Sequence, residues 1–438
     1  MKNELELENI MQSEYESAHD FLYGFVNYER GSDWKYNDDH FDLSRVSKLL
    51  HVLGDPHKKG RFVHIAGTNG KGSVAALVAS ALVESGYKTG LYTSPHLTTF
   101  RERIKINGEM ISKDDIVGEV KKIRDAAVGI EGLTFFDVWT VLAFSYFASR
   151  STDISIIEVG LGGRLDSTNV IEPDVSVITS ISMDHLDKLG GTLEKIALEK
   201  AGIIKPGVPV VCAPQADGVR SVIEEKAKQS GSDFVYIGKE ASFTIDYSVI
   251  HYSGLSWELN YLTIPLNGAF QNQNSALALA ALEILAAKFP SITAESARKG
   301  IKNVSWPGRL QTLALNPEII VDGASNIDAM TAVSEYLLER RPAGKIVVLF
   351  GICGDKEIER LIGILGTVVS QFVFTRADNP RALNADELMR LYGSETRDIY
   401  ESDPVTALKK AASLAGPNGL VIVTGSLYLV GEILKNYE

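Results

Sequence analysis

The segment around residue 67 constrains the fold of this chain more than any other part of the sequence. A short run of apolar and β-branched residues at 62–66 leads into the glycine-rich turn Gly67-Thr68-Asn69-Gly70-Lys71-Gly72-Ser73, and an apolar, helix-like stretch follows at 74–83. The backbone N–H groups of such a turn and the N-terminus of the next helix favour a bound anion. We therefore predict a phosphate-binding loop in which Lys71 reaches the β- and γ-phosphates of ATP and Ser73 binds Mg²⁺.

This turn is not a strict Walker A motif. Its hydroxyl lies two residues after Lys71 rather than one, which argues against a GTPase or an ordinary kinase. The alternative is an ordinary glycine-rich turn between a strand and a helix. An unpaired lysine inside such a turn has little structural purpose, so we favour the phosphate site.

Alternation of short apolar runs with helix-like segments continues along the chain. Runs at 62–66, 89–93, 154–159, 175–179 and 208–213 predict a doubly wound parallel sheet, and 243–264 predicts a small antiparallel meander. Trp306-Pro307-Gly308 interrupts the pattern, and a second alternation follows with strands at 319–321, 346–350, 372–375 and 420–424. We expect a P-loop-containing α/β domain over 1–305, a linker over 306–311 and a smaller Rossmann-like α/β domain over 312–438.

Composition narrows the function. With 438 residues and a net charge of −12, the chain is expected to fold as two or three domains and not to bind nucleic acid. No apolar run is long enough to span a bilayer, and the acidic N-terminus does not resemble a signal peptide. The two cysteines, Cys212 and Cys353, have no metal-ligand spacing, so we interpret them as core residues of a cytoplasmic protein.

Residues 160–165 resemble a dinucleotide-binding fingerprint but do not satisfy it. The segment reads Gly-Leu-Gly-Gly-Arg-Leu, with Leu165 where the last glycine should be. Ligands of open α/β sheets bind beyond the carboxyl ends of the strands, so Glu158 at the end of the preceding strand is a candidate active-site carboxylate. A solvated strand end is the alternative.

Several segments in register resemble folylpolyglutamate synthase/dihydrofolate synthase, the folate branch of the Mur ligase superfamily. The similar segments, in addition to the glycine-rich turn, are 94–97, 100–109, 158–166, 184–190, 199–206, 306–309, 322–324 and 425–432. This resemblance extends from about residue 15 to the C-terminus. It implies an ATP-dependent ligase that joins L-glutamate to a folate or dihydropteroate carboxylate through an acyl phosphate, with two Mg²⁺ ions.

The resemblance also assigns candidate site residues. It implies catalytic roles for Lys71, Glu158, His185 and Lys200, and a metal site made by Ser73, Ser94, Glu158, His185 and a carbamylated Lys200. ATP would contact Gly67 to Ser73, Asn274, Arg309 and Asp322, and the acceptor would contact Phe136 and Asp166. Ser325 lies where the family has a histidine on the amino-acid side, and Arg381 is a candidate to hold the glutamate carboxylates because its guanidinium fits a carboxylate. Chemistry alone favours a core or hydrogen-bonding histidine at 185, and only the resemblance makes it a metal ligand. The alternative for Lys200 is a helix-surface residue beside Glu199.

Two departures from the family pattern keep the substrate open. The family's His-Gln pair is Phe270-Gln271 here, and its Asp-Gly-Ala-His-Asn-Pro is Asp322-Gly323-Ala324-Ser325-Asn326-Ile327. A paralogue with another amine or acceptor therefore remains possible, as does a P-loop NTPase without ligase activity. A cell-wall Mur ligase is disfavoured because only 66 residues precede Gly67. We expect small-molecule partners only, no membrane, and a monomer.

Overall fold

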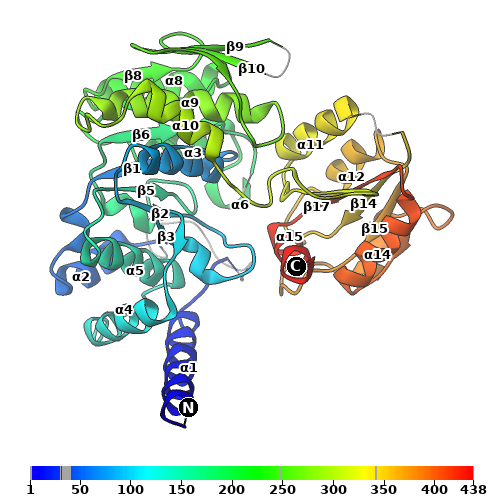
Figure 1. Ribbon diagram of the computed structural model, residues 1–438, viewed down its shortest axis with the longest axis horizontal. Helices are drawn as coiled ribbons and strands as arrows, with labels where there is room; N and C mark the ends of the chain where they lie inside the picture. The colour runs from blue at the N-terminus through cyan, green and yellow to red at the C-terminus, as the bar shows by residue number, and fades with distance from the viewer. Residues whose placement is uncertain are drawn as a thin grey trace.

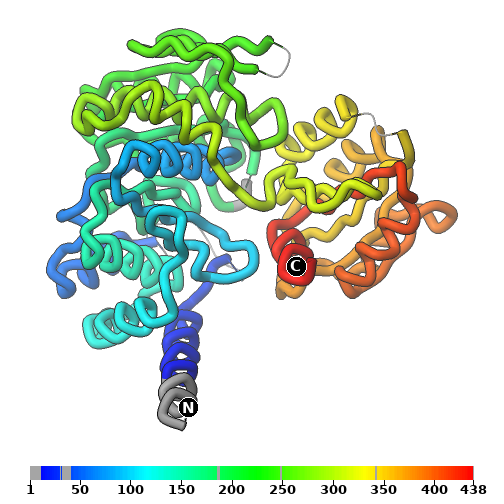
Figure 2. The backbone as a smooth tube through the Cα atoms, viewed as in Figure 1, coloured from blue at the N-terminus to red at the C-terminus, as the bar shows by residue number. Residues whose placement is uncertain are grey.

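The computed structural model of the protein describes residues 2–29, 31, 41–184, 186–246, 249–340 and 343–437. Two domains lie side by side, and the chain completes the first before it crosses to the second (Figures 1 and 2). Each domain contains a predominantly parallel sheet with helices on its faces. The predicted fold class is therefore confirmed.

The first domain has an eight-stranded sheet in the order β4-β3-β2-β5-β1-β6-β7-β8. Six of its strands are parallel, and the hairpin β3–β4 adds an antiparallel edge. Strands β3, β4 and β8 are not predicted from the sequence. Unlike β7, which lies within the longer apolar run at 208–213, they lie in shorter runs without a recognisable period. The strands are β1 (Phe62–Ala66), β2 (Thr89–Tyr92), β3 (Ile104–Ile106), β4 (Glu109–Met110), β5 (Ile154–Glu158), β6 (Val175–Ile178), β7 (Val210–Cys212) and β8 (Phe234–Tyr236).

Helices cover both faces of this sheet. Alternate residues of β1 point to opposite faces, so Val63 and Ile65 join the apolar core around α3, whereas Phe62 joins the core around α5. Because α3 lies between the sheet and a further helix layer, it is apolar around its whole circumference. The helices are α1 (Lys2–Tyr23), α2 (Leu43–Val52), α3 (Lys71–Glu84), α4 (Lys113–Ala126), α5 (Phe135–Ser149), α6 (Leu186–Leu189), α7 (Leu193–Ala201), α8 (Asp217–Gln229), α9 (Phe270–Ala286) and α10 (Ala294–Asn303).

The predicted meander is a three-stranded antiparallel sheet at the top of the first domain in Figure 1. Its strands are β9 (Ser242–Asp246), β10 (Val249–Ser253) and β11 (Glu258–Leu262). Buried Glu283 of α9 accepts the backbone N–H groups of Leu255, Ser256 and Trp257, so one carboxylate fixes the turn between β10 and β11.

The second domain has a six-stranded sheet in the order β12-β13-β17-β14-β15-β16, in which only β12 is antiparallel to its neighbour. Its two faces form separate apolar cores. The strands are β12 (Gln311–Leu315), β13 (Glu318–Val321), β14 (Ile346–Phe350), β15 (Gln371–Phe374), β16 (Ile399–Tyr400) and β17 (Leu420–Thr424). The helices are α11 (Ile327–Arg340), α12 (Ile358–Gly366), α13 (Ala385–Tyr392), α14 (Pro404–Ala415) and α15 (Leu427–Tyr437).

The carboxyl ends of the parallel strands from both sheets meet at one cavity between the domains. Gly160 and Leu161 follow β5 in the first domain, and Cys353 and Gly425 follow β14 and β17 in the second. All four residues line this cavity, whose volume is about 330 Å³. The fold therefore places its ligand-binding edges opposite each other.

Candidate active site

The glycine-rich loop between β1 and α3 is tied to the neighbouring strand end. The backbone N–H of Thr68 donates to the carbonyl of Ser180 at 2.8 Å, and Gly70 has a φ of 88°. A Cβ on Gly70 would lie 2.5 Å from Oδ1 of Asn274, so this position needs glycine for space as well as for conformation. The Lys71 ammonium donates to the carbonyls of Gly67 and Thr68, both at 3.1 Å.

Lys200 reaches the same loop from the C-terminal turn of α7. Its side chain is buried, and its ammonium donates to the carbonyl of Gly67 at 2.8 Å. Burial first and the nearby Lys71 second lower the pKa of Lys200 from 10.5 to about 7. The surface-lysine alternative is therefore wrong, and much of this amine is neutral near neutral pH.

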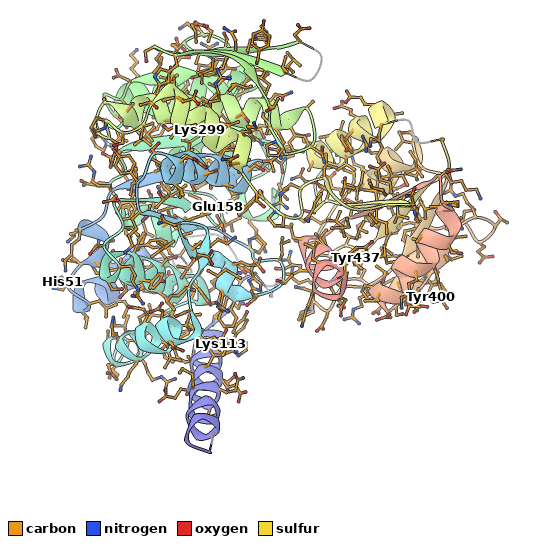
Figure 3. The ribbon with its side chains drawn as sticks, viewed as in Figure 1. His51, Lys113, Glu158, Lys299, Tyr400 and Tyr437 are labelled. Atoms are coloured by element: carbon orange, nitrogen blue, oxygen red, sulfur yellow. The ribbon has the colours of Figure 1, made fainter. Side chains whose placement is uncertain are left out.

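Glu158 is buried at the carboxyl end of β5, in the interior of the first domain (Figure 3). Its Oε2 accepts the backbone N–H of Ser94 at 3.2 Å. Burial raises the pKa of this carboxyl, while Lys71, the Ser94 N–H and Arg309 act in the opposite direction. The alternative of a solvated strand end is therefore wrong.

The structure tests only part of the proposed metal site. Ser94 and Glu158 are in contact, and buried Ser73 accepts a 3.4 Å hydrogen bond from Gln271 Nε2. His185 lies outside the described residues. Within the described ranges, no group of three or more His, Cys, Asp or Glu side chains is arranged to hold a metal ion.

A small cavity of about 40 Å³ is lined by the two lysines, Lys71 and Lys200. Gly160, Leu161 and Asp184 line both this cavity and the large one, so the phosphate loop and the interdomain cavity adjoin. A phosphoryl group at the loop would therefore lie beside a substrate bound between the domains.

Phe136 and Asp166 line the first-domain side of the large cavity. Asp166 Oδ2 accepts the backbone N–H groups of Gly160 at 3.0 Å and Leu161 at 2.9 Å, so this carboxylate also shapes the loop after β5. Burial raises the pKa of Asp166 to about 6, against the hydrogen bonds from Thr168 and the loop. A Cβ on Gly160 would lie 2.5 Å from the Phe136 ring, so the aromatic ring requires glycine at that position.

Asn274 borders the phosphate loop, whereas Arg309 and Asp322 lie close to each other where the linker enters the second domain. The Asn274 amide borders Gly70, and the buried Asp322 accepts the backbone N–H groups of Leu310 and Ala324 at 2.9 and 2.8 Å. Arg309 lies near Gly323 and acts on the pKa values of both Asp322 and Glu158. The linker arginine therefore lies close to Asp322, and its charge reaches Glu158 at the end of β5.

Ser325 and Arg381 line the second-domain side of the cavity. Arg381 is ion-paired with Asp355, and its Nε is buried without a hydrogen-bond partner among the described residues. Phe270, the other departure from the family pattern, packs against the apolar core of the second domain and does not line the cavity.

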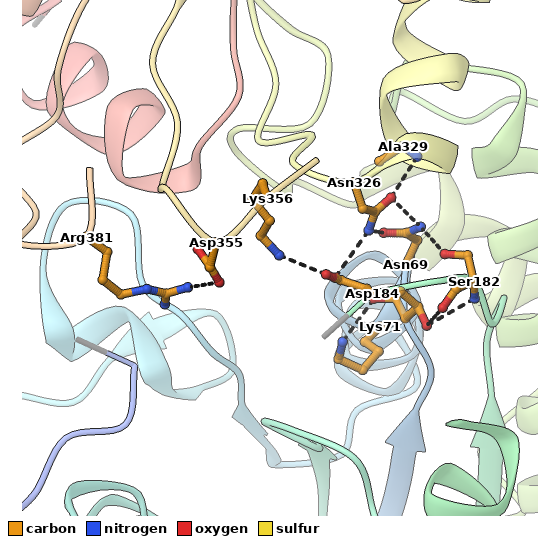
Figure 4. Close-up of polar contacts among 10 residues, drawn as sticks. Asn69, Lys71, Ser182, Asp184, Asn326, Ala329, Asp355, Lys356 and Arg381 are labelled. Atoms are coloured by element: carbon orange, nitrogen blue, oxygen red, sulfur yellow. Dashed lines mark hydrogen bonds and ion pairs between the residues drawn. The ribbon is translucent and has the colours of Figure 1, made fainter. Parts of the chain in front are cut away.

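Polar contacts join the two domains beside the cavity (Figure 4). Lys356 Nζ pairs with Asp184 Oδ1 at 2.8 Å, and Asn326 Nδ2 donates to Asn69 Oδ1 at 2.9 Å and to Asp184 Oδ2 at 3.3 Å. Asn69 is predicted from the sequence as part of the phosphate loop, whereas Lys356, Asp355 and Asn326 are not predicted to have a role. The available signal was position, since Asp355 and Lys356 closely follow strand β14.

Comparisons with known proteins agree along the chain. Residues 65–282 match the Mur ligase middle domain, and residues 308–427 match the Mur ligase glutamate ligase domain. The dihydrofolate synthase/folylpolyglutamate synthase of Bacillus subtilis is 36% identical over 94% of this chain and 100% of the relative. The folylpolyglutamate synthase of Lacticaseibacillus casei is 34% identical over 90% of this chain and 93% of the relative.

Solved structures show the same similarity. Folylpolyglutamate synthase from Mycobacterium tuberculosis, complexed with ADP, has a TM-score of 0.87 at 30% identity and covers 98% of this chain and 99% of that one. E. coli FolC in complex with DHPP and ADP has a TM-score of 0.85 at 30% identity, over 95% and 97% of the two chains. In the part of this chain that the structure describes, no helix is long and apolar enough to cross a membrane.

Proposed function

The chain belongs to the folylpolyglutamate synthase/dihydrofolate synthase family of Mur ligases, and we propose that it joins L-glutamate to a folate or dihydropteroate carboxylate at the expense of ATP. The carboxylate substrate is called the acceptor below. The observation that carries this proposal is the continuity between the phosphate loop and the interdomain cavity, which share Gly160, Leu161 and Asp184. Relatives solved with ADP support ATP as the nucleotide.

The reaction needs activation of the acceptor because a carboxylate does not condense with an amine in water. An acceptor oxygen attacks the γ-phosphorus of ATP, the bond to ADP breaks, and an acyl phosphate forms. The amine nitrogen of glutamate then attacks the acyl carbon and phosphate leaves. We propose that Lys71 of the phosphate loop and Arg309 of the linker offset the charge of the transferring group.

The oxygen donors of Ser73, Ser94 and Glu158 suit Mg²⁺. The Glu158 carboxylate is buried beside Ser94, and the buried Ser73 hydroxyl belongs to the phosphate loop. Hydroxyl and carboxylate oxygens suit a hard cation, and we propose that Ser73, Ser94, Glu158 and His185 hold one ion and carbamylated Lys200 a second. When bound, the ions neutralise charge on the phosphate oxygens.

Each domain supplies one side of the reaction. Phe136 and Asp166 of the first domain are proposed to contact the pterin ring of the acceptor, and Ser325 and Arg381 of the second to contact glutamate. Asn274, Arg309 and Asp322 are proposed to hold the rest of ATP. A site closed between two domains excludes water, which would otherwise hydrolyse the acyl phosphate.

Ligation of radiolabelled glutamate to a panel of dihydropteroate and reduced folates tests the proposal. We expect incorporation that requires both ATP and the acceptor, with release of ADP and phosphate. ATP hydrolysis that is indifferent to the acceptor would instead favour a P-loop NTPase. Ser325 gives a specific reason to include other amino acids, because the family's histidine is absent there.

A further inference from the structure

One wall of the interdomain cavity is a short segment of the N-terminal region. Residues 26–29, which we call the strap, all line the cavity. At its start, the Val26 carbonyl accepts the backbone N–H of Phe135 at 2.9 Å. Phe135 and Phe136 begin helix α5, so this end of the strap is fixed next to the proposed pterin contact.

The other end of the strap is held through Glu29. Its carboxylate accepts two hydrogen bonds from the Arg103 guanidinium, at 2.9 and 2.6 Å. Arg103 is fully buried, and its Nε donates to His96 Nδ1 at 3.0 Å. A buried guanidinium with these partners has a fixed orientation, so Arg103 is a rigid first-domain anchor.

A second anchor comes from the other domain. Arg381 donates through one terminal nitrogen to the backbone carbonyl of Glu29 at 3.0 Å, and its other terminal nitrogen pairs with Asp355. The backbone of Arg381 is itself fixed, because its N–H donates to Asn379 Oδ1 at 2.9 Å and its carbonyl accepts the Gly354 N–H at 3.0 Å. Arg381 therefore reaches from a well-defined loop of the second domain to the strap.

We propose that Arg381 is a positioning residue for the acceptor. By donating a hydrogen bond to the Glu29 carbonyl of the strap, the second domain completes the acceptor pocket of the first domain. This inference rests on the proposed function, and it gives Arg381 a role that does not require contact with glutamate. It also links the two half-sites, since the Glu29 end of the wall is held from both domains only when the domains are docked. A charge-assisted hydrogen bond of this kind corresponds to about tenfold or more in binding.

The test measures acceptor binding with glutamate absent. Calorimetric titration of the full-length protein, saturated with a non-hydrolysable ATP analogue, gives the Kd of a reduced folate or dihydropteroate. Arg381→Met should raise that Kd about tenfold, while the Kd for the nucleotide and the melting temperature stay near the wild-type values. If Arg381→Met folds poorly, Arg381→Lys keeps the charge beside Asp355 but has only one point of contact, and the same rise is expected.

Asp355→Asn is the matched control because it removes the ion pair and leaves the bond from Arg381 to the strap. Its acceptor Kd should stay within about threefold of the wild type. An unchanged acceptor Kd in Arg381→Met, with a raised KM for glutamate, would overturn the proposal and leave a glutamate contact only. Equal losses in Asp355→Asn and Arg381→Met would also overturn it. A wild-type protein that binds none of the acceptors would instead refute the proposed function.

Discussion

Lys71 and Lys200 donate to one and the same acceptor, the carbonyl oxygen of Gly67, at 3.1 and 2.8 Å. Two ammonium groups this close to each other repel, and only one of them is fully buried. Lys200 shows the effect, because burial and the charge of Lys71 lower its pKa to about 7. A large share of the Lys200 amine is therefore neutral near pH 7, beside the phosphate loop.

We predict that Lys200 is carbamylated in the active enzyme. The neutral amine attacks CO₂, forms an N–C bond and releases a proton, which turns a cation into an anion beside Lys71. Lys200→Ala should lose most activity, and added short carboxylates should restore part of it by taking the missing position. ¹³C NMR of protein equilibrated with ¹³CO₂ should show a carbamate signal that Lys200→Ala lacks. A bare amine in a substrate-loaded crystal, together with an active alanine variant, would contradict the assignment.

The lowered pKa of Lys200 should make the free energy of unfolding depend on pH. In CO₂-free buffer, the unfolded chain keeps Lys200 protonated up to about pH 10.5, whereas the folded protein releases this proton near pH 7. The unfolded state therefore binds more protons between these values, so stability rises with pH in this window and falls as the pH drops towards 7. The difference in unfolding free energy between wild type and Lys200→Met should follow this sign from pH 7 to 9. A pH-independent difference would mean that Lys200 keeps its ordinary pKa.

Replacing Lys71 tests the phosphate loop. Lys71→Ala removes the ammonium that lies against Gly67 and Thr68, and turnover at saturating ATP should fall by at least ~10²-fold. Lys299→Met is a suitable control because Lys299 is exposed on α10 (Figure 3), where the neighbouring Gly300 carbonyl accepts a hydrogen bond from Ser80 in the C-terminal half of α3. Near-wild-type turnover in Lys71→Ala would remove the lysine from the phosphate site.

Glu158 should control the magnesium requirement rather than folding. Glu158→Gln keeps an oxygen that can accept the Ser94 N–H but loses the negative charge, so the magnesium midpoint of activity should rise. His185→Ala should act in the same direction. Glu119→Gln is the control, because Glu119 is also buried but is bonded to Ser145 and Lys122 of the helix layer. Magnesium titrations beside thermal unfolding of each variant will separate the two effects. An unchanged midpoint with full activity would place Glu158 outside the metal site.

The parts of the fold that follow from local sequence could be predicted from the sequence. The loop at Gly67 to Ser73, the five parallel strands from β1 to β7 and the meander each leave a local signature of glycines or periodic apolar residues. The edge hairpin β3–β4 could not be seen, because its strands are short and gain their order from pairing with β2.

Contacts between the two domains also could not be predicted from the sequence. Asn326 meets Asn69, and Arg381 meets Glu29, across separations of 257 and 352 residues. No local pattern encodes such pairs, because they arise from the relative placement of two sheets. The lowered pKa of Lys200 is likewise a property of the fold, because its causes are burial and the charge of Lys71.

Ser325 is where the chain departs from its family at the proposed amino-acid site, and a change there should act on glutamate alone. A serine offers a short neutral hydroxyl, whereas histidine can donate a longer hydrogen bond or carry charge towards a carboxylate. Ser325 lines the cavity with Arg381, while its neighbour Asn326 is hydrogen-bonded to Asn69 and Asp184.

We predict a high KM for glutamate in the wild type and a lower one in Ser325→His, with the KM for ATP unchanged. Phe270→His is the matched control, because it restores the family residue at the other departure, where Phe270 packs against the second domain and does not line the cavity. This variant should leave the KM for glutamate unchanged. Steady-state kinetics of the three proteins with glutamate, aspartate and other amino acids will decide. An equal KM for glutamate in wild type and Ser325→His would show that the position tolerates either residue. A clear preference for another amine would overturn glutamate as the substrate but leave the ligase chemistry in place.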